Sequence, residues 1–214
     1  MTAPYPVAET RPPGLAAGAA SAGSPDPLAE VTLESQLAYH GVFFDVTRDR
    51  VRCPDGHEGV REFIRHPGAV MVVALLDADT ILLERQFRYP LGRSFVEMPA
   101  GKLEPGEDAL ACARRELQEE TGYAAGHWER LGAFHNAIGY SDEKIEVYLA
   151  RELDFVGAST DAGEVLEVFA APWRDLLEWI AQGTVTDVKT MVGAYWLERY
   201  LSGAGREPAP AARG

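Results

Sequence analysis

A cluster of charged residues, Arg115, Glu116, Glu119 and Glu120, lies in a segment with helical character. An α-helix turns by about 100° per residue, so Glu116 and Glu120 lie one turn apart on nearly the same line, with Glu119 beside them. Arg115 precedes Glu119 by one turn and can pair with its carboxylate. Crowded carboxylates repel one another unless cations neutralise them, and hard divalent ions such as Mg²⁺ prefer oxygen ligands. We therefore expect a magnesium site on this helix face.

A solvated acidic surface is the simpler interpretation, and for most Glu-rich helices it is the better one. It leaves the preceding loop unexplained. Residues 99–107, PAGKLEPGE, place two glycines and two prolines between a predicted strand and the helix. Such a loop fixes a sharp path for the chain and allows backbone carbonyls to face a ligand. The combination of loop and helix favours a binding site.

The loop and the helix together form a spaced motif. Gly101 is followed after five residues by Glu107, and after seven more by residues 115–123, RELQEETGY. This pattern resembles the Nudix box, GX5EX7REUXEEXGU with U a bulky apolar residue, and every fixed letter matches. Tyr123 stands where an aliphatic residue is usual, a difference that concerns packing rather than metal binding. The resemblance to Nudix hydrolases extends over about residues 38–201, and Glu107 is expected to hold the loop against the helix.

The resemblance implies a role for the other residues of the motif. Glu116 and Glu120 would bind the magnesium ions directly, and Glu119 would bind a metal ion or its water. Arg115 would orient Glu119, and the backbone carbonyl of Ala100 would be a further metal ligand. The implied reaction is a substitution at phosphorus of a nucleoside diphosphate linked to another group, with Mg²⁺ as cofactor and Mn²⁺ as the alternative.

Segments before the box resemble the family branch that acts on ADP-ribose and sugar nucleotides. Residues 81–90, ILLERQFRYP, match its Q-x-R-x-P strand end, and residues 94–103, SFVEMPAGKL, match its E-x-P-A-G entry to the box. Arg88 and Glu97 are therefore expected to bind the substrate, the Arg88 guanidinium through its fork of donors to the diphosphate. Without the resemblance, Arg88 would be interpreted as a surface arginine. The same segments argue against Nudix enzymes that clean oxidised nucleoside triphosphates or cut coenzyme A.

An acidic loop precedes the last predicted strand, within residues 161–169, DAGEVLEVF. In the ADP-ribose branch, a glutamate of this loop acts as the catalytic base or as a ligand of an activating metal. Glu164 is the best match and Glu167 is the second candidate. An exposed loop carboxylate is the simpler alternative for Glu164.

The segment after the box leaves the substrate open. Residues 134–149 resemble a stretch that usually contains S-P-G before an acidic run, but Ala137, Ile138 and Gly139 replace S-P-G here. The expected reaction is hydrolysis of ADP-ribose to AMP and ribose 5-phosphate, in competition with a broader activity on ADP-glucose, GDP-mannose and UDP-glucose. A module that senses ADP-ribose without cleaving it is a third alternative, which the intact box disfavours.

The elements that must position these residues follow from hydrophobic patterns and turn formers. Strands are predicted at residues 39–46, 51–64, 69–76, 80–88 and 94–98. A helix is predicted over 107–121, ended by Gly122. Further strands are predicted at 128–135, 144–153 and 165–171, and further helices at 174–182 and 187–201. The fold class is therefore mixed α/β (α+β).

The resemblance makes this fold class specific. It implies a Nudix fold, in which an α/β/α sandwich surrounds a mixed sheet, preceded by N-terminal antiparallel strands. We expect residues 29–65 to form those strands, which would contribute to a dimer and to the substrate site, and residues 66–202 to form the Nudix hydrolase domain. Residues 1–28 and 203–214 are rich in Ala, Gly and Pro and are expected to be disordered tails.

The composition limits the partners and the location. Thirty-three acidic and 20 basic residues give a formal net charge of −13, a field that repels nucleic acid but permits a small anionic substrate bound through metal ions. No apolar run approaches the roughly 18 residues of a membrane span, and no export signal is visible. The two cysteines have no zinc-type spacing. We expect a cytoplasmic protein without nucleic-acid or membrane partners.

The resemblance also implies a homodimer, because relatives in this branch are typically homodimers. Tyr39, Phe43 and Phe44 form an aromatic group in the predicted N-terminal strands and are candidates for the interface. A place in the protein core is the alternative for these side chains.

Overall fold

The computed structural model describes residues 26–158 and 165–203. Of the predicted disordered tails, only residues 26–28 and 203 belong to these ranges, so the remainder of both predictions lies outside the described residues. The chain forms two compact units. Of the described residues, one unit contains 26–35 together with Asp49–Arg61, and the other contains Gln36–Arg48 together with residues 62–158 and 165–203.

The N-terminal strands are β1 (Val31–His40), β2 (Asp45–Arg52) and β3 (Glu58–Arg65), hydrogen-bonded in the order β1-β2-β3. The prediction of a strand over residues 39–46 was wrong, because the chain turns between β1 and β2. Gly41 N–H donates to the carbonyl of Phe44 at 3.0 Å. A Cβ at Gly41 would lie 2.4 Å from the same carbonyl oxygen, so this turn requires glycine.

A mixed sheet lies at the centre of the larger unit. Its order is β7-β4-β9-β8. Strand β4 pairs parallel with β9 and antiparallel with β7, and β8 pairs antiparallel with β9. The strands are β4 (Ala69–Ala74), β7 (Ala100–Lys102), β8 (Tyr123–His135) and β9 (Lys144–Phe155).

A second, antiparallel sheet has the order β10-β5-β6. Its strands are β5 (Thr80–Arg88), β6 (Arg93–Glu97) and β10 (Leu166–Pro172). The short 3-10 helix η1 (Tyr89–Leu91) joins β5 to β6. The register places Arg88 opposite Arg93 at the end where these two strands are joined, and Glu84 opposite Glu97 at the other end of the pairing.

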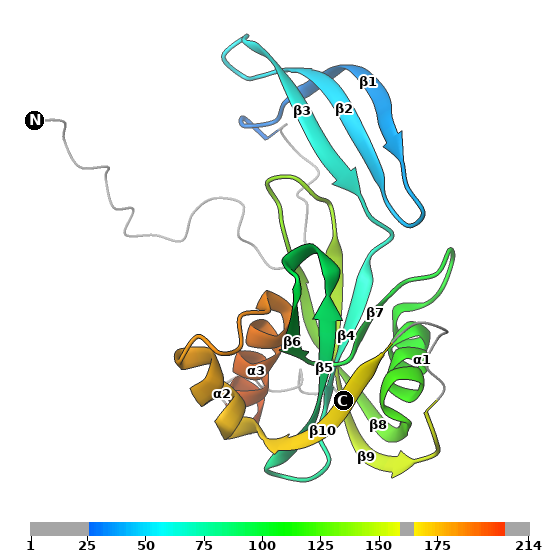
Figure 1. The fold of residues 1–214 in the computed structure, drawn as a ribbon. Helices are drawn as coiled ribbons and strands as arrows, with labels where there is room; N and C mark the ends of the chain where they lie inside the picture. The colour runs from blue at the N-terminus through cyan, green and yellow to red at the C-terminus, as the bar shows by residue number, and fades with distance from the viewer. Residues whose placement is uncertain (1–25, 159–164, 204–214) are drawn as a thin grey trace, which may run out of the picture. The chain divides into compact units, whose positions relative to one another are not determined.

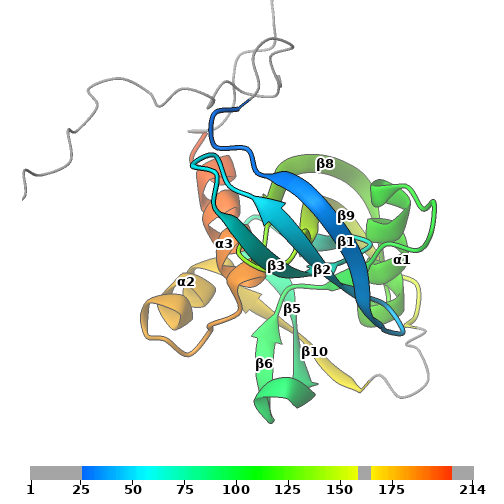
Figure 2. The same cartoon turned by 90° about the horizontal axis from the view of Figure 1, so that it is seen from above.

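Helices cover both faces of the mixed sheet (Figures 1 and 2). The helices are α1 (Ala109–Thr121), α2 (Trp173–Ala181) and α3 (Val188–Leu201). Alternate residues of β4 point to opposite faces. Val70 and Val72 share a buried cluster with Leu117 of α1. Met71 and Val73 belong to a second cluster that contains side chains of α2 and α3. These two clusters confirm the predicted α/β/α sandwich around a mixed sheet.

None of the helices in the described ranges is long and apolar enough to cross a membrane.

Candidate active site

Helix α1 presents the acidic residues of the spaced motif. It begins at Ala109 rather than at residue 107, because Asp108 is its N-cap and accepts hydrogen bonds from the backbone N–H groups of Leu110 and Ala111. It ends before Gly122, as predicted, and this glycine has a left-handed conformation with φ of 76°. Both ends of the helix are thus fixed by local sequence.

Strand β7 brings the loop backbone against α1. Residues 100–102 were expected to belong to a loop, but Ala100 pairs with Met71 of β4. Ala100 N–H donates to Glu120 Oε2 at 3.0 Å, and Glu120 is buried. A Cβ at Gly101 would lie 1.8 Å from the carboxyl carbon of Glu116. Only glycine at this position allows the Glu116 carboxylate to lie against the strand.

Arg115 contacts three carboxylates rather than the single one expected. Its Nε and Nη2 donate to Glu107, both at 3.0 Å. Its Nη1 donates to Glu116 Oε1 at 2.8 Å and to Glu119 Oε2 at 3.0 Å. The hydrogen bonds to Glu107 are the main cause of a raised Arg115 pKa. In turn they hold the pKa of Glu107 at about 2, well below its usual value. Glu107 therefore ties the loop to the helix, as the resemblance implied.

The donor set fits a hard divalent cation. Glu116, Glu119 and Glu120 offer carboxylate oxygens, and Gly101 keeps the space beside the strand clear for one of them. Across the described ranges, no three His, Cys, Asp or Glu side chains already converge as a metal-binding group. Arg115, which also binds Glu107, offsets only part of the negative charge of Glu116 and Glu119. Metal binding by these glutamates and by the Ala100 carbonyl stays a prediction.

Arg88 and Glu97, both predicted for substrate binding, are bound to each other. Arg88 Nε donates to Glu97 Oε1 and Arg88 Nη2 donates to Glu97 Oε2, each at 2.7 Å. Lys189 also binds Glu97 Oε2. The net pKa of Glu97 lies below its usual value. Burial is the largest single influence and acts to raise this pKa, but the hydrogen bonds and charges of Arg88 and Lys189 together outweigh it. Sequence reasoning missed Lys189, a single lysine at the start of a helix.

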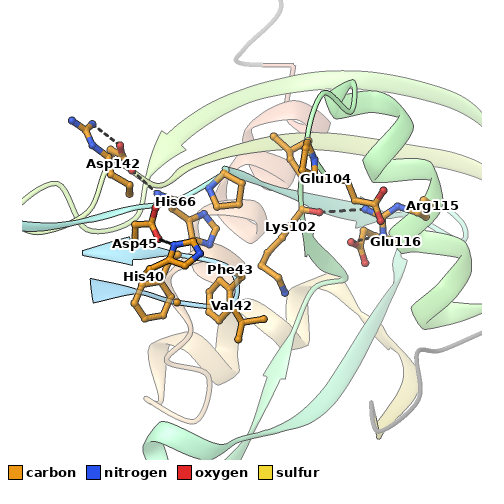
Figure 3. A pocket seen from close by; sticks show the side chains of 16 residues that line it. His40, Val42, Phe43, Asp45, His66, Lys102, Glu104, Arg115, Glu116 and Asp142 are labelled. Carbon is orange, nitrogen blue, oxygen red and sulfur yellow. Dashed lines mark hydrogen bonds and ion pairs between the residues drawn. The ribbon is translucent and has the colours of Figure 1, made fainter. Parts of the chain in front are cut away.

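Two cavities lie beside the residues described above, one lined in part by Arg115 and Glu116 and the other by Arg88 and Lys189. The larger, of about 650 Å³, has the size of a small-molecule site. Figure 3 shows Arg115 and Glu116 on one side of it, with Phe43 and His66 on the other. The smaller, of about 290 Å³, is lined by Arg88, Ala100, Gly101 and Lys189, among others. Phe43 and Lys102 line both cavities.

The candidates for the catalytic base are not brought to the site by any described contact. Glu164 lies outside the described residues. Glu167, the second candidate, is in β10, is 70% exposed and binds Arg85 of the neighbouring strand at 2.6 Å. Its contact with Arg85 favours an exposed cross-strand pair over a catalytic role for Glu167.

Residues 65–190 match the family model described as the NUDIX domain, which is more than half of the chain. The chain belongs to the Nudix family. A solved structure described as the crystal structure of ADP compounds hydrolase matches with a TM-score of 0.75 and 22% sequence identity. The match covers 86% of this chain and 100% of that chain, and it supports the fold.

Three proteins of similar sequence match between 59% and 80% of this chain. ADP-ribose pyrophosphatase of Bacillus subtilis (strain 168) is 38% identical over 173 residues, 80% of this chain and 94% of the relative. ADP-ribose pyrophosphatase of Mycobacterium tuberculosis (strain ATCC 25618 / H37Rv) is 42% identical over 127 residues, 59% of this chain and 61% of the relative. GDP-mannose pyrophosphatase of Escherichia coli O1:K1 / APEC is 28% identical over 186 residues, 79% of this chain and 92% of the relative.

Proposed function

We propose that this protein hydrolyses the diphosphate bond of ADP-ribose, with Mg²⁺ as cofactor, to give AMP and ribose 5-phosphate. The observation that carries this proposal is the approach of β7 to α1, in which Ala100 binds Glu120 and Gly101 makes room for Glu116. The higher identity to ADP-ribose pyrophosphatases than to GDP-mannose pyrophosphatase supports ADP-ribose as the substrate.

In the proposed reaction, Glu116, Glu119, Glu120 and the Ala100 carbonyl would hold the divalent cation. A bound divalent cation neutralises the diphosphate and lowers the pKa of a bound water. Arg115 keeps Glu116 and Glu119 oriented through its hydrogen bonds.

Arg88 would donate hydrogen bonds to the diphosphate oxygens. The water oxygen forms a bond to one phosphorus, and the bridging bond from that phosphorus to oxygen breaks. Glu164 is proposed to take the proton from the water.

The proposal is tested by the products. Incubation of ADP-ribose with the protein and Mg²⁺ should give equal amounts of AMP and ribose 5-phosphate, measured by liquid chromatography and mass spectrometry. Excess EDTA should stop the reaction, and Mg²⁺ should restore it at least as well as Mn²⁺. Intact ADP-ribose in the presence of Mg²⁺ would contradict the proposal.

The change Glu164→Gln is expected to lower kcat by roughly 10²-fold, a usual effect of losing a general base. Glutamine keeps the size of the side chain but cannot accept the proton. The measurement is steady-state kinetics with ADP-ribose at saturating Mg²⁺, with Glu167→Gln as the matched control that keeps wild-type turnover. Equal turnover in Glu164→Gln and the wild type would remove Glu164 from the mechanism.

A broader activity on nucleoside diphosphate sugars is the second candidate function. The observation that favours it is the replacement of the S-P-G segment by Ala137, Ile138 and Gly139. The GDP-mannose pyrophosphatase relative gives it additional support. Comparable kcat/KM for ADP-ribose and GDP-mannose would favour this candidate.

We also propose that the protein is a cytoplasmic homodimer. Tyr39 is 59% exposed and Phe43 is 51% exposed, so the core alternative is wrong for these two side chains. Exposed aromatic groups of this kind are typical of protein interfaces. Light scattering should give the mass of two chains, and the mass of one chain would contradict the dimer. Recovery from the secreted fraction of the source cells would contradict the location.

A further inference from the structure

Three structural elements meet at the carboxylate of Glu97. Arg88 ends β5, Glu97 ends β6, and Lys189 lies in the first turn of α3. The Glu97 side chain is only 2% exposed, and both of its oxygens accept hydrogen bonds from these two cations. A carboxylate so engaged is suited to holding its partners rather than to binding a substrate itself.

The start of α3 is fixed against the end of β6. Thr190 is fully buried, and its Oγ1 accepts a hydrogen bond from Met98 N–H at 3.0 Å. Thr190 in turn donates from its hydroxyl to Asp187 Oδ2, the N-cap of α3, at 2.6 Å. A Cβ at Gly193 would lie 2.6 Å from the sulfur of Met98, the residue after β6, so α3 packs closely against this side chain. These contacts set the position from which Lys189 reaches Glu97.

The local environment of Lys189 is unfavourable for a positively charged side chain. A cation in the first turn of a helix is disfavoured by the positive end of the helix dipole. Its side chain is only 15% exposed, so the ammonium also loses hydration. Asp187 and Glu97 offset these costs, with Lys189 Nζ 3.0 Å from Asp187 Oδ2. A charged residue placed where helix dipole and burial both disfavour it commonly belongs to a functional site.

The cavity of about 290 Å³ places Lys189 near the candidate chemistry. Arg88 and Lys189 line it together with Ala100 and Gly101 of β7, the strand that contacts the glutamates of α1. Lys189 therefore belongs to the same cavity as the guanidinium expected at the diphosphate.

We propose that Lys189 is a positioning residue for the substrate diphosphate, acting through Glu97 on Arg88; this inference rests on the proposed function. Glu97 holds the guanidinium along its Nε and Nη2 edge, and arginine has further donors for a phosphate. Lys189 shares the charge of Glu97, which leaves more of the positive charge of Arg88 for an anion. Without Lys189, Glu97 would bind Arg88 more strongly and compete with the phosphate.

The test is a double-mutant cycle on the steady-state kinetics of ADP-ribose hydrolysis with Mg²⁺. Lys189→Met is expected to raise KM about 10-fold with a smaller change in kcat, the size of effect known for residues that support a ligand-binding group. Lys189→Arg should restore KM to within about threefold of the wild type, because it restores the cation. The double change with Arg88→Met should raise KM no further than Arg88→Met alone.

Lys144→Met is the matched control. Lys144 also binds a carboxylate, Glu146 at 2.5 Å, but it lines neither of the two cavities. Its removal should leave KM unchanged. The unfolding midpoint of each variant separates a binding effect from a loss of fold, and Lys189→Gln, which also removes the cation and should raise KM in the same way, is the second variant if Lys189→Met does not fold.

The outcomes distinguish this inference from the function on which it rests. A wild-type KM in folded Lys189→Met, failure of rescue by Lys189→Arg, or additive effects with Arg88→Met would overturn the positioning role while the wild type remains active. A wild type that neither hydrolyses nor binds ADP-ribose would overturn the proposed function, and the positioning role with it.

Discussion

The change Glu120→Gln is expected to lower the magnesium-dependent kcat/KM by roughly 10²–10³-fold, the range found when one electrostatic contact to a transition state is removed. Glu120 is 3% exposed and accepts the Ala100 N–H at 3.0 Å. Glutamine keeps this shape and can still accept that hydrogen bond through its amide oxygen. It removes the negative charge that a divalent cation requires. Activity should therefore be lost while the fold is kept.

The measurement for Glu120→Gln combines kinetics over a range of Mg²⁺ concentrations with circular dichroism and the thermal unfolding midpoint. Glu178→Gln, at an exposed position of α2, is the matched control and should behave as the wild type in both respects. Full activity in Glu120→Gln would mean that the metal site is assigned to the wrong residues. An altered circular dichroism spectrum would mean that Glu120 serves the fold.

The change Gly101→Ala is expected to lower kcat/KM by about 10²-fold, because the new Cβ would displace the Glu116 carboxylate. That Cβ would lie 1.8 Å from the carboxyl carbon. Gly101 is not among the glycines with positive φ, so alanine can adopt the backbone conformation. The end of the glutamate side chain can rotate away, which should limit the loss of unfolding free energy to about 2 kcal/mol.

Activity and unfolding free energy measured together test this account of Gly101. Gly59→Ala is the matched control, since its Cβ would also meet the end of a flexible side chain, Arg61 Nη1 at 3.1 Å. It should leave activity unchanged. Wild-type activity in Gly101→Ala would show that the Glu116 carboxylate does not need to lie beside the strand.

The acidic helix could be predicted because its signals are local. A period of 3.6 residues sets which side chains share a face, and Gly122 supplies the left-handed residue that ends the helix. Strand β7 could not be predicted in the same way. Ala100, Gly101 and Lys102 have no strand pattern, and they are extended because they pair with β4. The pairing depends on residues distant in sequence.

The turn between β1 and β2 was missed for a different reason. Residues 39–46 are rich in aromatic and β-branched types, which favour a strand. The hydrogen bond between Gly41 and Phe44 overrides this preference. A glycine within an apparent strand was the available signal.

Lys189 shows which part of the site lies beyond sequence patterns. Nothing near it in the sequence indicates that it meets Arg88 and Glu97, because the three residues come from different elements. The cation in the first turn of α3 was the one local irregularity that could have drawn attention to it.

The claim that this protein hydrolyses ADP-ribose is tested most directly by measuring kcat/KM, with Mg²⁺, for a panel of ADP-ribose, ADP-glucose, UDP-glucose and GDP-mannose. Phosphate release by alkaline phosphatase, which acts only on the phosphomonoester products, gives the rates. We predict turnover with ADP-ribose as the preferred substrate. Binding of ADP-ribose without turnover of any compound in the panel would contradict the enzymatic account and favour a sensing module.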